Sequence, residues 1–376
     1  MTGSNKKCIS VHNLKTNMVL ADDAIAKNGQ ILIPAGTVIT ENHLFRMNLY
    51  QILSAVVLKD STTEAIEVAT NPPVSEDDHV LTPALISIND HSPHRTEDYL
   101  RFSKAFTQVD QDIRNHFDAI LLGQPIDSQS LLTSVETMMK SVRLKSDLFT
   151  YMSHIKGDND HTYAHSVNVA ILCNTLGRWL KMKENEIKDL TIAALIHDIG
   201  KTKISPEILN KIDRLTEEEY DAVRQHAQLG YNIIDYSDLS DRIKQAVLLH
   251  HERNDGSGYP FGYTGQQIPD FAKIIAIADI YDAMTSSRSY HTKFSPFKVI
   301  QLFEQESAGY LDTKYLFIFL ENIAHYYLGE EVLLSDGSKG KIVFIHNESP
   351  SRPIIKSGDE MIDLMTTRNL SIEELL

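Results

Sequence analysis

Imidazole and carboxylate side chains recur through the middle of this sequence, on patterns typical of helices. His161 and His165 are four residues apart, one helical turn, so their side chains share a helix face. His197 and Asp198 directly follow the apolar run TIAALI. The other members of the set are His226, His250, His251 and Asp279. Neutral imidazole and ionised carboxylate are ligands for a divalent, ferrous or ferric ion that keeps positions open for water and substrate.

Asp279 lies within the apolar helical pattern AKIIAIADIYDAM. Burying an unpaired carboxylate costs several kcal/mol, so this position calls for a cation or a hydrogen-bonded partner. A single His at the end of an apolar helix is more often a capping or surface side chain than a ligand. Four or more helices that each supply one or two such groups are instead typical of a metal site in a bundle core.

Length and composition narrow the class of protein. The 376 residues are enough for two to three domains, and 42% hydrophobic with 23% charged residues is typical of a soluble globular chain. The net charge of −15 disfavours a nucleic-acid polymer as partner. Only Cys8 and Cys173 occur, which indicates a reducing compartment. No leader-like segment and no apolar run of about 18 residues is present, so we expect a cytoplasmic protein without membrane insertion.

The pattern predicts a mainly α fold flanked by two small β-containing parts. We expect a small α+β module over 1–70, with Thr40 capping a short helix, and a linker or surface excursion over 71–96. Connecting helices follow over 97–144 and an all-helical domain over 145–328. A β-rich appendage with Asp-Gly and Ser-Gly turns closes the chain over 329–376.

Two helices carry specific expectations. The apolar stripe that starts at Tyr99 and runs to Leu121 predicts an amphipathic helix of some six turns. That stripe either packs within its own chain or forms the contact of a homodimer, and the sequence leaves both open. Thr216 and Glu219 form a capping box, and we place His226 on the helix that this box begins.

Several motifs resemble one known family. HDIGK starts at His197, HHERNDGSGYP starts at His250, and IADIYDAMTSSRSY contains Asp279. With HTYAHSVNVA at 161–170 and the isolated His226, they closely resemble the HD-GYP subgroup of the HD superfamily of metal-dependent phosphohydrolases. The resemblance covers residues 145–328. It implies an HD-type all-helical bundle that holds two or three metal ions, commonly iron and sometimes manganese, and hydrolyses cyclic di-GMP to pGpG or GMP.

The resemblance also implies a ligand set. The family's ligands fall on His165, His197, Asp198, His226, His250, His251 and Asp279. Asp198 is then the bridge between two ions. Four residues before His165, family members carry either Glu, which binds a third metal, or Tyr, whereas this chain has His161. His161 is either a ligand of a third ion or a residue that orients substrate or faces solvent.

The reaction requires positive charge in an acidic protein. Two metals about 3.5 to 4 Å apart neutralise a phosphodiester and lower the pKa of a bridging water, whose hydroxide attacks phosphorus. Lys201 can reach a phosphate or leaving oxygen, or else is a solvated lysine at a helix end. In this family Arg288 binds the second phosphate, and His291 stands where another basic residue often follows. Tyr259, in the glycine-rich connection 252–269, offers a ring to guanine or a hydroxyl to phosphate, or pins the loop.

Two alternatives remain open from the sequence. One is a cyclic di-GMP receptor that turns over slowly and signals through a partner protein, and the other is an HD-type hydrolase of another nucleotide. The amino-terminal module gives no ligand. Asp22 and Asp23 lie in a strand-like run without alternating helices, which argues against a phospho-receiver domain.

Overall fold

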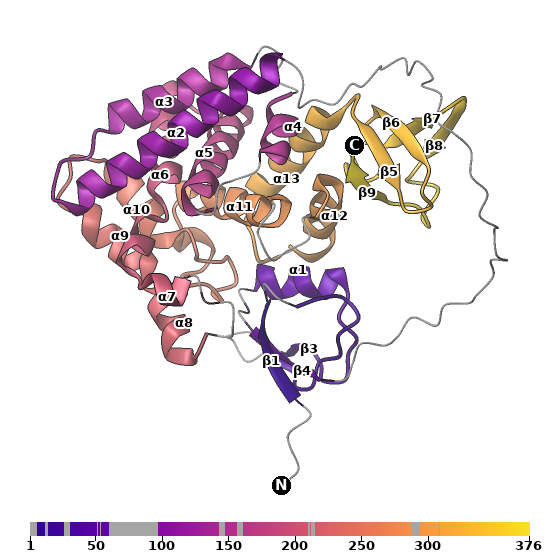
Figure 1. The fold of residues 1–376 in the computed structure, drawn as a ribbon, viewed down its shortest axis with the longest axis horizontal. Helices are drawn as coiled ribbons and strands as arrows, with labels where there is room; N and C mark the ends of the chain where they lie inside the picture. The colour runs from indigo at the N-terminus through magenta and orange to yellow at the C-terminus, as the bar shows by residue number, and fades with distance from the viewer. Residues whose placement is uncertain are drawn as a thin grey trace, which may run out of the picture.

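The computed structural model describes residues 6–11, 14–25, 31–50, 52, 54–59, 97–142, 147–155, 161–209, 211, 215–286, 294–307 and 309–376. The described part is mainly helical, with a small module before the helices and an antiparallel sheet after them, as predicted (Figure 1). The linker expected at 71–96 lies outside the described residues. No helix in the described ranges combines the length and apolar character needed to span a membrane.

The amino-terminal module is built from two short antiparallel pairs and one helix. Its elements are β1 (Lys6–Ser10), β2 (Ala24–Ile25), β3 (Ile31–Ile33), α1 (Glu41–Leu49) and β4 (Ser54–Leu58). β1 pairs with β4, and β2 pairs with β3. The predicted cap is confirmed, because the His43 amide donates to Thr40 Oγ1 over 3.4 Å at the start of α1.

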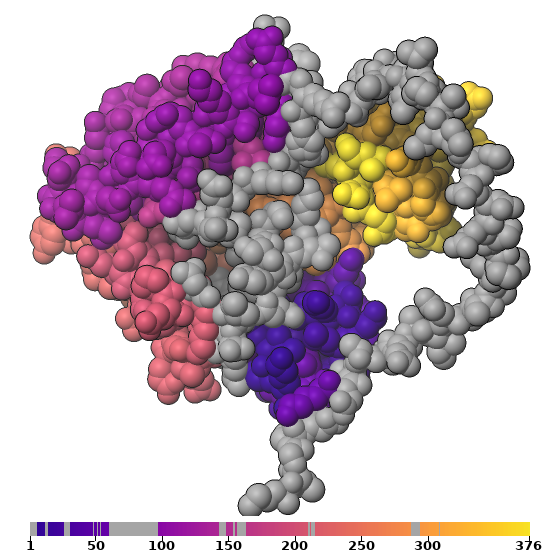
Figure 2. All heavy atoms as spheres, viewed as in Figure 1, coloured from indigo at the N-terminus to yellow at the C-terminus, as the bar shows by residue number. Residues whose placement is uncertain are grey.

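Helix α1 docks the module onto α12 (Pro296–Glu306). Phe45 and Phe303 meet edge to face with ring centroids 6.0 Å apart, and both rings are buried. Arg46 pairs with Glu306 over 3.4 Å at the rim. In the space-filling view the module, in indigo, lies directly beneath the C-terminal sheet, in yellow (Figure 2).

The long amphipathic helix packs within its own chain. α2 (Glu97–Leu121) lies along α3 (Ser128–Ser141) and also contacts α4 (Asp147–His154) and α5 (His161–Trp179). Its apolar stripe is buried, as follows: Tyr99, Phe102, Phe106, Val109, Ile113, Phe117 and Ile120. Of the two alternatives for this stripe, packing in cis is therefore the one observed.

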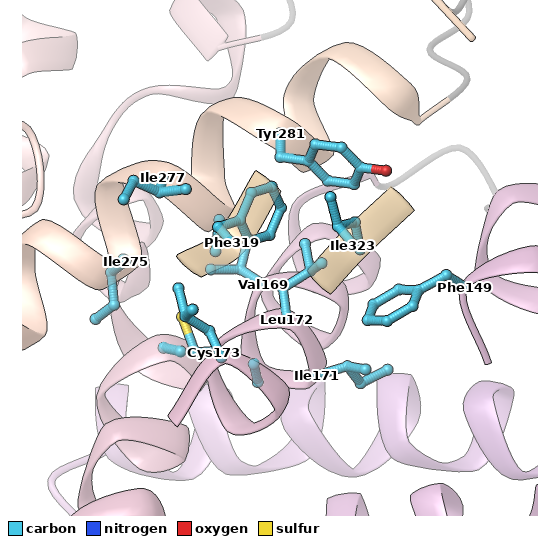
Figure 3. Packing of buried hydrophobic residues seen from close by; sticks show 14 of the residues in the cluster. Phe149, Val169, Ile171, Leu172, Cys173, Ile275, Ile277, Tyr281, Phe319 and Ile323 are labelled. Atoms are coloured by element: carbon cyan, nitrogen blue, oxygen red, sulfur yellow. The ribbon is translucent and has the colours of Figure 1, made fainter. Parts of the chain in front are cut away.

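The central helices are apolar on most of their circumference because other helices cover them on several sides. α5 packs against α6 (Glu184–Ile196), α11 (Asp270–Thr285) and α13 (Thr313–Ile323). Figure 3 shows the middle of this core, where α5, α11 and α13 meet around Leu172, Ile277 and Phe319. The same cluster of buried residues extends from Phe45 of α1 to the C-terminal sheet. The amino-terminal module also has a separate core of its own, which includes Leu20, Ile33 and Val57.

Shorter elements connect these helices. They are η3 (Ile199–Lys203), α7 (Pro206–Leu209), α8 (Glu217–Arg224), α9 (His226–Ile234), α10 (Asp241–Leu249), η4 (Gly265–Gln267) and η5 (Ala324–Tyr327). The capping box at α8 is confirmed, with Thr216 Oγ1 accepting from the Glu219 amide. The placement of His226 on that helix was wrong. α8 ends at Arg224, and after Gln225 a separate helix, α9, begins with His226 and packs against η3.

The predicted β-rich appendage is a five-stranded antiparallel sheet in the order β8-β7-β6-β5-β9. Its strands are β5 (Glu331–Leu334), β6 (Lys339–Phe344), β7 (Ile354–Ser357), β8 (Glu360–Asp363) and β9 (Ile372–Leu375). Both predicted turns are present, with Gly337 at φ +83° and Gly358 at φ +58°. The pairing of β9 with β5, at the far edge from β8, was not predicted.

Candidate metal centre

Seven side chains from five parts of the helical region converge in one buried place. Their ligand atoms form two groups, and within each group all the atoms lie within 4.8 Å of one another. The first group is Asp198, His226, His250 and His251, and the second is His165, His197 and Asp279. These seven are the ligands that the family resemblance implied.

Helix ends supply most of these groups, which fixes their direction. His197 follows the last residue of α6, and Asp198 leads into η3. His226 is the first residue of α9, and His250 follows α10. The close approach of η3 to α9 requires Gly200, because a Cβ there would overlap the carbonyl oxygen of His226.

Asp198 lies between the two groups. Its Oδ1 is 3.3 Å from His226 Nε2 and 3.9 Å from His250 Nε2. Its Oδ2 is 3.3 Å from His197 Nε2 and 3.9 Å from His165 Nε2. A carboxylate that turns one oxygen toward each group is placed to bridge two cations.

The backbone sets the tautomer of three of the imidazoles. The Nδ1 atoms of His197, His226 and His250 lie 2.8, 2.7 and 2.8 Å from the carbonyl oxygen three residues earlier. A carbonyl oxygen only accepts, so each Nδ1 carries the hydrogen and donates. The Nε2 lone pair of each ring is thereby directed into the centre, as in histidines that bind metal.

The Nε2 atoms of neighbouring imidazoles lie close together. His226 Nε2 is 3.3 Å from His250 Nε2 and 3.1 Å from His251 Nε2. Within the described part of the chain, the buried atoms His197 Nε2 and Asp198 Oδ1 have no hydrogen-bond partner. Buried acceptors that converge without donors destabilise the fold unless a cation lies between them. The residues therefore fit a metal centre with nitrogen and oxygen ligands.

Burial keeps three histidines in the form that binds metal. It lowers the pKa of His226 to about 4 and holds the pKa values of His250 and His251 well below their usual range. Burial also opposes ionisation of Asp198. The neighbouring His197 and Lys201 outweigh it and hold the pKa of Asp198 well below its usual range.

His165 behaves differently because two carboxylates contact it. Burial alone would lower its pKa, but Asp279, 3.1 Å from Nε2, and Asp282, 2.7 Å from Nδ1, together raise the pKa to about 9. At neutral pH His165 is therefore an imidazolium that donates from Nε2 to Asp279 and from Nδ1 to Asp282. A metal that binds Nε2 displaces the proton there.

The predicted substrate residues lie beside this centre where they are described. Lys201 Nζ is 2.5 Å from Asp198 Oδ2, so it pairs with the central carboxylate rather than standing in solvent. The Tyr259 ring stacks on His251, with centroids 4.6 Å apart, and the Arg224 guanidinium carbon lies 4.8 Å from the same ring. Tyr259 thus supports the imidazole of His251, a candidate ligand.

Three predicted residues cannot be placed in the same way. Arg288 and His291 lie outside the described residues. His161 is the first residue of α5, but its side chain lies outside what the structure describes.

The loop after His251 is organised by Glu252, a residue without a predicted role. Its buried carboxylate accepts the amides of Phe261, Gly262 and Tyr263 over 2.7, 3.1 and 2.9 Å. Gly258 lies so close to this turn that a Cβ there would overlap the backbone of residues 251–253. The glycine-rich segment is therefore a compact loop folded on one carboxylate.

Asp282 is a second residue that the sequence analysis missed. It accepts from His165 Nδ1 over 2.7 Å and from Ser286 Oγ over 2.6 Å, and so orients a candidate ligand. The available signal was its position three residues after Asp279, on the same face of an apolar helix.

Comparison with known proteins places this site in context. Residues 149–315 match the HD domain model. The cyclic di-GMP phosphodiesterase PA4108 of Pseudomonas aeruginosa is 30% identical over 276 residues, which cover 73% of this chain and 65% of that protein. The 3'3'-cGAMP-specific phosphodiesterase 1 of Vibrio cholerae is 32% identical over 237 residues, which cover 62% of this chain and 53% of that protein. The chain thus spans between half and two thirds of the length of these curated relatives.

A solved structure is also similar in outline. Bd1817, an HDG"Y"P protein from Bdellovibrio bacteriovorus, aligns over 84% of this chain and 98% of its own, with 13% identity and a TM-score of 0.49.

The contact between Asp282 and His165 predicts the effect of Asp282→Asn. The substitution keeps the size of the side chain but removes the charge that orients His165, so we expect metal affinity to fall about 10- to 100-fold. Metal per folded chain, measured by elemental analysis after dialysis against graded chelator, checks this. Asp359→Asn, at an exposed turn between β7 and β8, is the control and should match the unmodified protein. Equal metal retention in both variants would contradict the assigned role of Asp282.

Proposed function

We propose that residues 149–315, which match the HD domain model, form an HD domain of the HD-GYP type, and that the chain is a metal-dependent phosphodiesterase that hydrolyses cyclic di-GMP. The observation that carries the proposal is the position of Asp198 between two groups of converging imidazoles and carboxylate. Curated relatives named as cyclic di-GMP phosphodiesterases support the choice of substrate.

We assign the metal ligands in two sets that share Asp198. His226, His250 and His251 hold one ion, and His165, His197 and Asp279 hold the other. Two bound ions supply positive charge for the phosphodiester and lower the pKa of a water molecule. We propose iron, with manganese as the alternative, because mixed imidazole and carboxylate ligands suit both.

The remaining residues bind and orient the substrate. Lys201 pairs with Asp198 and, beside a bound phosphodiester, would donate to a phosphate or leaving oxygen. Arg288 binds the second phosphate through its guanidinium fork, and His291 adds a donor that depends on pH. Tyr259 holds His251 in place and closes the site on the side of the loop.

The proposal also covers the location of the protein, its partners and its division into domains. We propose a cytoplasmic protein whose substrate is cyclic di-GMP and which has a signalling protein as a further partner. A homodimer would use a surface other than the stripe of α2, which is buried in its own chain. We keep the division into a module at 1–70, a linker at 71–96, helices at 97–144, a catalytic domain at 145–328 and an appendage at 329–376.

The activity is tested with protein purified without oxygen and product chromatography. We expect steady-state conversion of cyclic di-GMP to pGpG or GMP, and slower conversion of 3'3'-cGAMP, the substrate named for one Vibrio cholerae relative. Asp198→Ala should abolish turnover and lower metal content, because two cations then repel one another without a shared anion. A single turnover without steady-state hydrolysis would favour a receptor, and activity retained in Asp198→Ala would contradict the assigned bridge.

We extend the proposal to a third ion at His161. Residues four apart on a helix are about 6 Å apart along its axis, so His161 and His165 can serve adjacent ions. The unmodified protein should then hold three metals, His161→Ala should lose about one per chain, and His165→Ala should lose more. Elemental analysis of folded protein measures this directly. A count of two that His161→Ala leaves unchanged would rule out the third ion.

A further inference from the structure

Arg253 is a buried cation beside the candidate ligands. Arg253 is only 2% exposed. By volume it has the largest side chain among the fully buried residues of the described chain. Its Nη1 donates to the carbonyl oxygens of His250 and Glu252 over 3.0 and 2.9 Å. Among the described residues, no carboxylate lies within ion-pair distance of it. Its charge must therefore be stabilised by other groups.

The first of these groups is the end of α10. His250 follows Leu249, the last residue of that helix, so its carbonyl lies at the negative end of the helix dipole. The Arg253 guanidinium donates to this carbonyl and thereby caps α10. Because His250 and His251 leave the helix at this point, the cap fixes the direction of two candidate ligands.

The second group is the ring of Tyr310. The Arg253 guanidinium carbon lies 5.4 Å from the ring centroid, within the range of a cation–π contact. The backbone joins the two residues as well, because the Asn254 amide donates to the Tyr310 carbonyl over 3.0 Å. Tyr310 is itself buried, so a shift of its ring must be transmitted to Arg253.

The other neighbour of Tyr310 belongs to the amino-terminal module. Tyr50 follows α1, and its ring centroid lies 4.7 Å from that of Tyr310 at 47° between planes. Burial and then the charge of Asp255, two residues after Arg253, raise the pKa of Tyr50. Tyr50 is held in place by the docking of Phe45 on Phe303.

We propose that Tyr50 of the amino-terminal module is a positioning residue for the metal centre, acting through Tyr310 and Arg253 on the end of α10. The proposal builds on the metal centre of the proposed function. It gives the module a defined effect: a movement of α1 relative to α12 removes the support of the Arg253 cap and loosens the ligands His250 and His251.

The test measures the rate at which folded, metal-loaded full-length protein releases metal to excess chelator. Tyr50→Ala should accelerate release about tenfold, the scale expected when an aromatic contact supporting a site is lost. Tyr50→Phe keeps the ring and should stay near the unmodified rate. Glu41→Gln removes the 3.3 Å ion pair between α1 and Lys298 of α12, which is solvent-exposed at Glu41 and therefore contributes little to docking. It is the control for a substitution in α1 that leaves the aromatic contacts intact, and it should not change the rate.

A double-mutant cycle tests the route. If Tyr50 acts through Arg253, then Tyr50→Ala and Arg253→Lys combined should release metal little faster than Arg253→Lys alone. If the increases in release rate caused by the two single substitutions multiply in the double variant, the two residues act independently and the proposal is overturned. An unchanged release rate in Tyr50→Ala would overturn it as well. If Tyr50→Ala does not fold, Tyr50→Leu keeps the apolar volume without the ring and is measured in its place.

The outcome separates this proposal from the proposed function. Protein that holds metal and releases it faster in Tyr50→Ala, but does not hydrolyse cyclic di-GMP, keeps the positioning role and refutes the activity. Protein that hydrolyses cyclic di-GMP, with Tyr50→Ala equal to the unmodified chain in metal release and kcat, keeps the activity and refutes the positioning role.

Discussion

The buried Asp198 carboxylate, which lies among the imidazoles of His165, His197, His226 and His250, is the constraint on which the site depends. Backbone carbonyls take the Nδ1 hydrogens of three histidines, so their Nε2 lone pairs converge on the carboxylate. Such a set is unfavourable without positive charge. Lys201 and the protonated His165 supply part of that charge, and bound cations would supply more.

The fold serves this constraint by bringing helix ends together. η3 and α9 approach closely at Gly200, which places Asp198 next to His226. Each candidate ligand is then held by a second group, as Asp282 holds His165 and Arg253 caps the end of α10. Because these supports are buried, the positions of the ligands depend on packing far from the metals, including the docking of α1 on α12.

The sequence predicted most of the elements that carry the site, because their signals are local. The stripe of α2 and the capping box at Thr216 each lie within a few turns of one helix. The break between α8 and α9 escaped prediction because residues on both sides of Gln225 are compatible with a helix, and only packing against η3 separates them.

The supporting residues could not be found from local patterns. His165 and Asp282 are 117 positions apart in the sequence, so no local pattern pairs them. In the sequence Asp282 is only a charged residue within an apolar helical pattern. Glu252 resembled an ordinary loop acid, although it binds three amides about ten residues further on. The ligand set was predicted chiefly through its family resemblance, since spacing alone could not pair residues from five separate segments.

The central claim is that these seven side chains form one centre with metals bridged by Asp198. X-ray absorption at the metal edge of the loaded, folded protein tests it most directly. The account predicts a first shell of nitrogen and oxygen with imidazole scattering, and a metal–metal distance of about 3.5 to 4 Å. Isolated ions without metal–metal scattering, at full metal loading, would contradict it.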